Sequence, residues 1–206
     1  MTGLHDVNTP FSLFTSSSDI LKSHSDHYFP RFNYSACELW LCTEICHIIN
    51  AGEQGLQQRS GGKVFLYNED KKRDLTLYSS GETKKPVIEK HIEVKVIYPV
   101  SKSKFGSSIY SLCKKLSKTL DATYPLEGWV YLVWTQHYKI SPDEFFETRL
   151  DWLTTAVNEN EYFGDSGKQY QPVFSEIKEI AEACLTWRGQ EKRIIVKAIA
   201  FSLHPV

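Results

Sequence analysis

Long apolar runs are missing from this 206-residue sequence. The run at residues 129–134 is far shorter than the roughly 20 residues that a membrane-spanning helix needs. No basic patch followed by an apolar block stands near the N-terminus, so we expect no secretory signal. We therefore expect a cytoplasmic protein that has no membrane partner.

Cysteines are few and irregularly spaced, at positions 37, 42, 46, 113 and 184. An odd number of cysteines without a regular framework favours reduced thiols over a set of disulfides. Cys42 and Cys46 lie one turn apart in a predicted helix, and no second pair of ligands follows at the spacing of a zinc site. Small buried thiols are therefore the better interpretation of these residues.

An excess of one charge is also missing, since 24 basic side chains stand against 25 acidic ones. This balance excludes a polycation that coats nucleic acid without selectivity. Residues 84–118 nevertheless contain nine lysines and two glutamates, a local charge of +7. Such segregation can build a positive face for a polyanionic partner, although a solvated, lysine-rich helix and loop would give the same local excess.

The length and an apolar content of 41% predict one soluble domain with a real core. We expect residues 1–33 to form an irregular arm with room for one short helix. Residues 34–206 are expected to form a single α/β domain, with a core at 34–134 and a C-terminal extension at 135–206.

Hydrophobic periodicity predicts the order of elements in that domain. Ser35 and Glu38 fit a helix-capping box, and apolar residues at intervals of three and four continue this helix to Gly52. The same analysis predicts strands at 63–67, 74–78, 87–98, 128–134 and 193–203. It predicts further helices at 107–120, 142–158 and 173–187, and a loop at 164–172. This order predicts a mixed α/β domain with one central sheet.

Chemically useful residues stand on two of these strands. Asp74 begins the second predicted strand, and Glu93, Val94 and Lys95 lie within the third. Alternate strand residues share a face, so Glu93 and Lys95 should project from one face while Val94 faces the opposite way. If the two strands are neighbours, Asp74 and Glu93 can share Mg²⁺, which polarises a phosphodiester and activates water.

The sequence Asp74, eighteen residues, then Glu93-Val94-Lys95 resembles the PD-(D/E)xK nuclease superfamily, which includes many restriction endonucleases and Holliday-junction resolvases. The resemblance covers residues 34–134, where the predicted order of helix, three strands, helix and strand matches the family core. It implies a restriction-endonuclease-like mixed sheet flanked by helices, with C-terminal helices and a last strand. It also implies DNA hydrolysis dependent on Mg²⁺, for which Mn²⁺ can substitute. Arg73 stands where the motif has proline.

The resemblance also implies roles for individual residues. Asp74, Glu93 and the Val94 carbonyl would be metal ligands, and Lys95 would position water or offset negative charge. Glu38 would be a first-helix carboxylate that supports the metal site. Phosphate contacts are expected from lysines of the basic helix and of the loop before it, namely Lys114, Lys115 and Lys118, and Lys102 and Lys104. A homodimer is expected because many family members cut two strands.

Each of these residues has a simpler interpretation. Glu93 and Lys95 could form an exposed charge pair on the sheet, and Asp74 could end a turn. A capping box places glutamate at position 38 whatever the function, and His91 could contact substrate or be solvated. The near-neutral charge and the acidic C-terminal region would also suit a non-catalytic module that binds nucleic acid or a protein. The intact set of Asp, Glu and Lys favours the enzyme.

Overall fold

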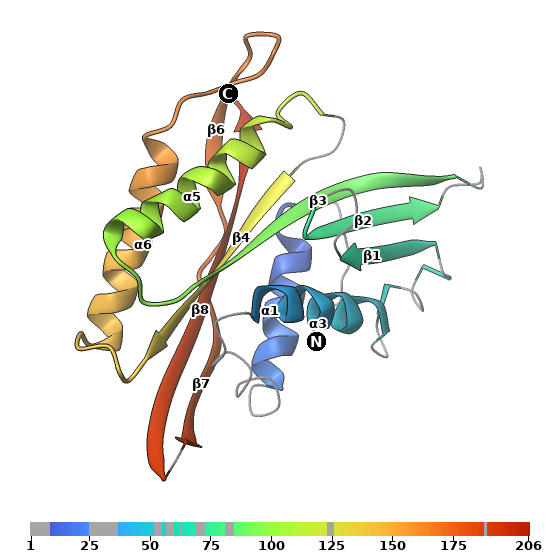
Figure 1. The fold of residues 1–206 in the computed structure, drawn as a ribbon. Coiled ribbons are helices and arrows are strands. Elements are labelled where there is room, and N and C mark those ends of the chain that lie inside the picture. Colours follow the sequence, from blue (N-terminus) through green and yellow to red (C-terminus); the bar gives the residue numbers. More distant parts are fainter. Residues whose placement is uncertain are drawn as a thin grey trace.

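The structure, a computed structural model, describes residues 9–24, 37–51, 55–56, 60–61, 63–68, 73–80, 85–122, 126–187 and 189–206. The helices in these ranges are α1 (Ser12–Ser23), α3 (Cys37–Ala51), α5 (Lys102–Ser117) and α6 (Pro142–Asn158) (Figure 1). The strands are β1 (Val64–Asn68), β2 (Leu75–Ser80), β3 (Pro86–Ile97), β4 (Leu126–Thr135), β5 (Tyr162–Phe163), β6 (Gln169–Phe174), β7 (Lys178–Trp187) and β8 (Gln190–Pro205).

All eight strands belong to one open sheet, which confirms the prediction of a mixed α/β domain. Strands β1, β2 and β3 are antiparallel neighbours, β3 and β4 are parallel, and β4 is antiparallel to β8. The long strand β8 pairs along its other edge with β7 and then with β6, and β5 pairs with β6. Helix α5 lies between the two parallel strands in the chain, as the crossover from β3 to β4 requires.

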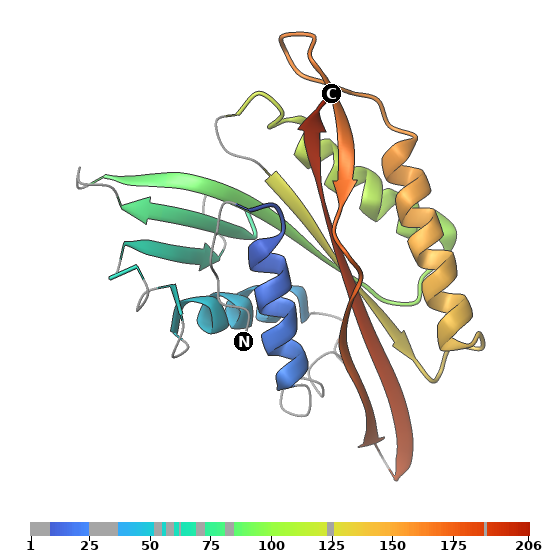
Figure 2. The ribbon, with the colours of Figure 1, turned by 180° about the vertical axis from the view of Figure 1, so that it is seen from behind.

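Helices cover both faces of the sheet (Figures 1 and 2). Helices α1 and α3 pack on one face, where Phe14 and Leu41 belong to an apolar cluster that includes Trp129 of β4. Helices α5 and α6 pack on the other face, where Phe105 and Phe145 belong to a second cluster. Strand β4 alternates between the two clusters, so it is buried on both sides and is a continuous apolar run in the sequence.

Helices α5 and α6 begin at serine caps. The Ser141 hydroxyl accepts a hydrogen bond from the Glu144 N–H, and Pro142 takes the first helical position, as the sequence predicts. Ser101 caps α5, which therefore begins before the predicted residue 107, so Lys102 and Lys104 lie on the helix and not in a loop. Within the ranges that the structure describes, no helix is long and apolar enough to cross a membrane.

The helix predicted at residues 173–187 is wrong, because this segment ends β6 and forms β7. The register of β7 against β8 shifts between Glu179 and Ala181, which leaves Ile180 as an extra residue at a β-bulge. Ile180 and Ala181 are consecutive and both buried, so the bulge breaks the alternation of buried and exposed residues that identifies a strand in a sequence. The predicted loop at 164–172 likewise contains the start of β6. In the described part of the C-terminal extension, α6 is therefore the single helix.

The described part of the N-terminal arm is largely one helix, in the segment for which we expected an irregular arm with room for one short helix. Residues Ser12–Ser23 form α1, which buries Leu13, Phe14 and Leu21 against the sheet and α3. The Phe11 N–H donates to Oε1 of Glu127 at 3.2 Å, which ties the start of α1 to strand β4. Helix α3 is present as predicted, whereas the capping residue Ser35 and the closing residue Gly52 lie outside the described residues.

Candidate active site

The C-terminal half of β3 has an open edge. Strand β2 pairs with β3 only as far as the pair of Leu75 with Ile92, while β4 follows the opposite edge to Ile97. Beyond Ile92, two carboxylates accept the N–H groups that a neighbouring strand would otherwise bind. Oδ2 of Asp74 accepts from the Val94 N–H at 2.7 Å, and Oε2 of Glu38 accepts from the Val96 N–H at 3.0 Å. Acidic groups from two other elements therefore meet along this edge.

Asp74 stands directly before β2, so the register of β2 on β3 brings it to this edge. Burial raises the pKa of the Asp74 carboxyl above its ordinary value, and the negative charge of Glu93 raises it further. The hydrogen bond from Val94 and the positive charges of Lys115 and Lys95 oppose this rise. The structure therefore brings Asp74 and Glu93 together, with two lysines near enough to act on them.

Glu93 projects toward the face of the sheet that α5 covers. Its side chain is 1% exposed, and Oε1 accepts a hydrogen bond from Nη1 of Arg73 at 2.9 Å. Oε2 forms an ion pair with Nζ of Lys115, on α5. The interpretation of Glu93 and Lys95 as an exposed charge pair does not describe this arrangement, because Glu93 is buried and binds other cations.

Lys95 is held by the first turn of α3. Its Nζ lies 2.9 Å from Oε1 of Glu38, and both side chains are about one-third exposed, at 36% and 35%. A hydrogen bond of 3.0 Å between Sγ of Cys37 and the hydroxyl of Tyr98 joins α3 to the end of β3. In the structure the Glu38 carboxylate therefore fixes the Lys95 ammonium and the β3 backbone at once.

Two residues of this site were not singled out by the sequence motif. Arg73 carries no motif signal except that it precedes Asp74, yet it binds Glu93. Lys115 was expected to contact DNA phosphate, and the structure pairs it with Glu93. The one sequence signal for the contact between Lys115 and Glu93 is that Lys115 follows the buried Leu112 by three residues. Residues three apart lie on the same side of a helix, so Lys115 lies on the side of α5 that is near the sheet.

The other predicted phosphate-binding lysines lie along α5 and at its C-cap, at Lys102, Lys104, Lys114 and Lys118. Lys102 lies over the ring of Trp152, with Nζ 5.3 Å from the ring centroid. His91 is different, because it is only 4% exposed and its Nδ1 lies 3.0 Å from the Thr76 hydroxyl. His91 is therefore neither solvated nor placed to contact a substrate.

The donor atoms at the open edge suit a hard divalent cation. Mg²⁺ is typically bound by one or two carboxylates together with several waters, and carbonyl oxygens are compatible ligands. Asp74 and Glu93 supply two carboxylates. The N–H and C=O of one strand residue face the same neighbour, so the Val94 carbonyl faces the edge at which Asp74 lies. Among the described residues, no cluster of three or more His, Cys, Asp or Glu side chains could hold a metal ion. A cation held by Asp74 and Glu93 would therefore need the Val94 carbonyl and water as its other ligands.

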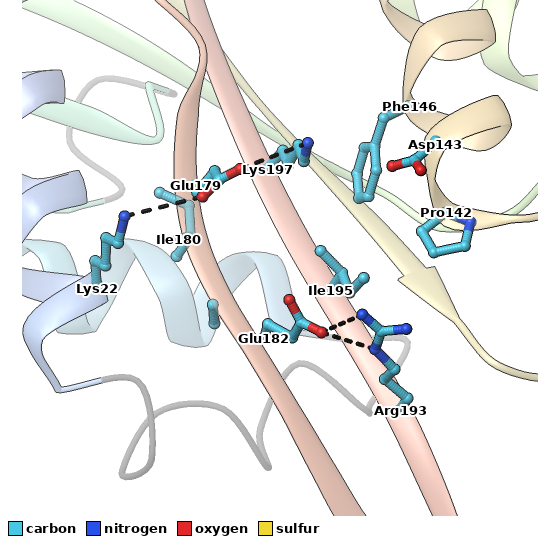
Figure 3. A pocket seen from close by; sticks show the side chains of 11 residues that line it. Lys22, Pro142, Asp143, Phe146, Glu179, Ile180, Glu182, Arg193, Ile195 and Lys197 are labelled. Carbon is cyan, nitrogen blue, oxygen red and sulfur yellow. Dashed lines mark hydrogen bonds and ion pairs between the residues drawn. The ribbon is translucent and has the colours of Figure 1, made fainter.

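Two cavities lined by described residues lie outside this cluster. A cavity of about 530 Å³ lies between the start of α6 and strands β7 and β8 (Figure 3). Its charges largely satisfy one another, because Glu179 pairs with Lys22 and Lys197, and Glu182 pairs with Arg193. A second hollow of about 420 Å³ lies between the end of β3 and the first turns of α5 and adjoins the site through Val96. Val96 and Lys104 are among the residues that line it.

No protein-family model matches this chain, and neither does any curated protein or solved structure. The resemblance to the nuclease superfamily therefore depends on the motif residues and on their geometry. A function has to be inferred from the chemistry of the open edge of β3.

Proposed function

We propose that this chain is a metal-dependent DNA endonuclease of the PD-(D/E)xK type, with a restriction-endonuclease-like core. The observation that carries the proposal is the hydrogen bond from the Val94 N–H to Oδ2 of Asp74, which joins the start of β2 to the Glu93-Val94-Lys95 segment. The order of α3, β1, β2, β3, α5 and β4, with β1 to β4 adjacent in the sheet, supports the same assignment.

Asp74, Glu93 and the Val94 carbonyl would hold the cation, which is Mg²⁺ or Mn²⁺. When bound, this cation supplies Lewis-acid polarisation of the phosphodiester and lowers the pKa of water. Glu38 holds the Lys95 ammonium at 2.9 Å and also binds the β3 backbone, so Lys95 is a fixed positive charge. A fixed ammonium beside the scissile phosphate orients water and stabilises the negative charge that develops in the transition state.

DNA is the substrate that the charge distribution favours. The lysines exposed on α5 lie on the face of the sheet toward which Glu93 projects, whereas the protein as a whole carries a charge of only −1. A local basic surface on a neutral body binds a polyanion at one place and not over the whole molecule. The hollow lined by Val96 and Lys104 lies beside the first turns of α5, which carry part of this surface.

The test is cleavage of supercoiled plasmid with Mg²⁺, with Mn²⁺ and with EDTA. We expect nicking that EDTA abolishes and that Lys95→Ala reduces by about 100-fold, the size of effect seen when one transition-state contact is removed. Glu93→Gln should have a similar effect, and circular dichroism should establish that this variant folds. Glu161→Gln and Lys139→Ala, two exposed positions outside the site, are the matched controls. Undiminished nicking by Lys95→Ala and Glu93→Gln would mean that a contaminant or another site is responsible.

A second candidate function follows from the ion pairs of Glu93. Because Arg73 and Lys115 bind both of its carboxylate oxygens, Glu93 could serve a structural network in a non-catalytic nuclease-like module that binds nucleic acid or a protein partner. Such a module would bind DNA equally well with EDTA and with Mg²⁺ and would cleave under neither condition. The metal dependence of binding and cleavage, measured on one preparation, separates the two functions.

A further inference from the structure

Lys115 occupies a central position among the acidic groups of the candidate active site. Its ammonium is paired with Oε2 of Glu93, and its positive charge also acts on the nearby Asp74. The two carboxylates that would share a divalent cation therefore already share one positively charged group. That group comes from α5, an element that contributes no residue to the nuclease motif.

Among the residues that the structure describes, the charges at the open edge balance without any metal. The acidic groups are Asp74, Glu93 and Glu38, and the basic groups are Arg73, Lys95 and Lys115. Adding a divalent cation to this balanced set would leave two excess positive charges in a partly buried site, which is unfavourable. At least one basic side chain must therefore move away from the carboxylates when a metal binds.

Lys115 is the basic side chain that can move at the lowest cost. Arg73 is 19% exposed, directly precedes Asp74 in the chain, and holds Glu93 with a planar guanidinium. Lys95 binds Glu38 instead of the two carboxylates that would hold the metal. Lys115 is 47% exposed and carries its charge on a flexible four-carbon chain, so its ammonium can turn toward solvent while α5 stays in place.

We propose that Lys115 is a built-in counter-ion that neutralises Glu93 in the metal-free protein and leaves Glu93 when a divalent cation binds. The ammonium and the metal then compete for one carboxylate. After it leaves Glu93, Lys115 joins Lys114 and Lys118 on the exposed side of α5, where a DNA phosphate can bind it. Metal binding thereby prepares the site for DNA. This inference rests on the proposed function.

The experiment measures Mn²⁺ affinity without DNA, by titration calorimetry and by electron paramagnetic resonance, at one fixed pH for all variants. Lys115→Met removes the competing ammonium, so we expect it to bind Mn²⁺ roughly tenfold more tightly than the unmodified protein does. Lys115→Arg keeps a competing cation and should bind Mn²⁺ with nearly unchanged affinity. Lys139→Met removes an exposed charge outside the site, which forms no ion pair with any described residue, and should change the affinity by less than about twofold.

A second measurement guards against a variant that is merely destabilised. Without metal, Lys115→Met leaves the buried Glu93 with Arg73 as its cation, so its melting temperature should fall. Saturating Mn²⁺ should then raise the melting temperature of Lys115→Met by more than it raises that of the unmodified protein.

The outcomes separate this inference from the proposed function. If Lys115→Met binds Mn²⁺ no more tightly than the unmodified protein does, while Asp74→Asn abolishes binding, the counter-ion role is wrong and the metal site stands. If neither the unmodified protein nor Lys115→Met binds Mn²⁺ saturably, the metal-dependent function itself is overturned.

Discussion

Oδ2 of Asp74 accepts a hydrogen bond from the backbone N–H of Val94 at 2.7 Å. The contact lies two residues beyond Ile92, the last residue of β3 that pairs with β2, so a side chain takes the place of a strand. The same contact brings the Asp74 carboxylate close to Glu93, which faces α5. The register of β2 on β3 therefore fixes how close Asp74 lies to Glu93. An ionised Asp74 is unfavourable in this partly buried position beside another carboxylate.

The raised pKa of Asp74 predicts how its replacement changes stability with pH. A carboxyl whose pKa is higher in the folded protein than in the unfolded chain keeps its proton to a higher pH in the folded state. The free energy of unfolding therefore falls as the pH rises from the carboxyl pKa in the unfolded chain to the carboxyl pKa in the folded protein. The loss of stability persists at neutral pH. Asp74→Asn should raise the free energy of unfolding at pH 7, and the gain should disappear below the ordinary aspartate pKa of 3.8.

Urea unfolding of both proteins in EDTA, from pH 3.5 to pH 8, measures this difference. EDTA is needed because a bound cation would stabilise the ionised form of the unmodified protein and hide the effect. If Asp74→Asn instead lowers the stability by the same amount at every pH, the Asp74 carboxylate is a favourable structural group and burial does not raise its pKa.

Gly128 controls how closely α5 approaches the site. It is the register partner of Glu93, and a Cβ atom at this position would lie 3.0 Å from Phe201 and 3.2 Å from Leu112. Leu112 lies about one turn before Lys115 on α5. Gly128→Ala should therefore cost about 1–3 kcal/mol of stability through overpacking and move Lys115 away from Glu93.

Gly106→Ala is the matched control for this variant. Gly106 lies within α5 itself, and a Cβ atom at this position would meet nothing within 4 Å. Replacing a helical glycine with alanine should stabilise the protein by about 0.5–1 kcal/mol. Urea unfolding gives both values, and equal effects at the two glycines would show that α5 is not closely packed over Gly128.

The lysines of α5 should determine how DNA binding depends on salt. Lys104→Gln and Lys118→Gln should each lower DNA affinity, and each should reduce the slope of log K against log salt by about 0.9 for every phosphate that the variant no longer neutralises. Fluorescence anisotropy with a labelled duplex in EDTA measures both quantities without cleavage. Lys22→Gln is the control and should change neither quantity, because Lys22 lies on α1, which packs on the opposite face of the sheet. If all three variants behave alike, α5 is not the DNA surface.

Much of the fold could be predicted because its periodicity is simple. Helix α6 has a serine cap, a proline at its first position and regular apolar spacing. In β3, Ile92 and Val94 alternate with Glu93 and Lys95, and the structure places Ile92 and Val94 in the cluster under α1 and α3 while Glu93 faces α5. The assignment of the two faces therefore needed no tertiary information.

The remaining features depend on contacts that no local pattern contains. The β-bulge at Ile180 interrupts the alternation of β7, and only the pairing with β8 identifies this segment as a strand. The ion pairs of Glu93 with Arg73 and Lys115 depend on how α5 lies over the sheet. The spacing of the motif predicts that acidic residues can meet, but it does not predict which cations accompany them.

A buried ion pair should be essential for docking α1 on the sheet. Lys90 and Glu127 are 3% and 2% exposed, and Nζ of Lys90 lies 2.5 Å from Oε1 of Glu127. The same carboxylate accepts hydrogen bonds from the Phe11 N–H at 3.2 Å and from Nε1 of Trp129 at 2.9 Å. Phe11 has a left-handed conformation with φ of 61°, which is unfavourable for a residue with a side chain. Glu127 therefore compensates for strain at the start of α1.

Lys90→Met leaves the buried Glu127 carboxylate without its cation, and it should cost about 3–5 kcal/mol in urea unfolding. Glu127→Gln removes the charge but keeps an acceptor, so adding it to Lys90→Met should restore part of the lost stability. Hydrogen exchange at the amide of Phe11 should become faster in Lys90→Met and slower again in the double variant. If the two changes destabilise the protein additively, the pair is not coupled, and α1 must be held by its apolar contacts with Trp129 and α3 alone.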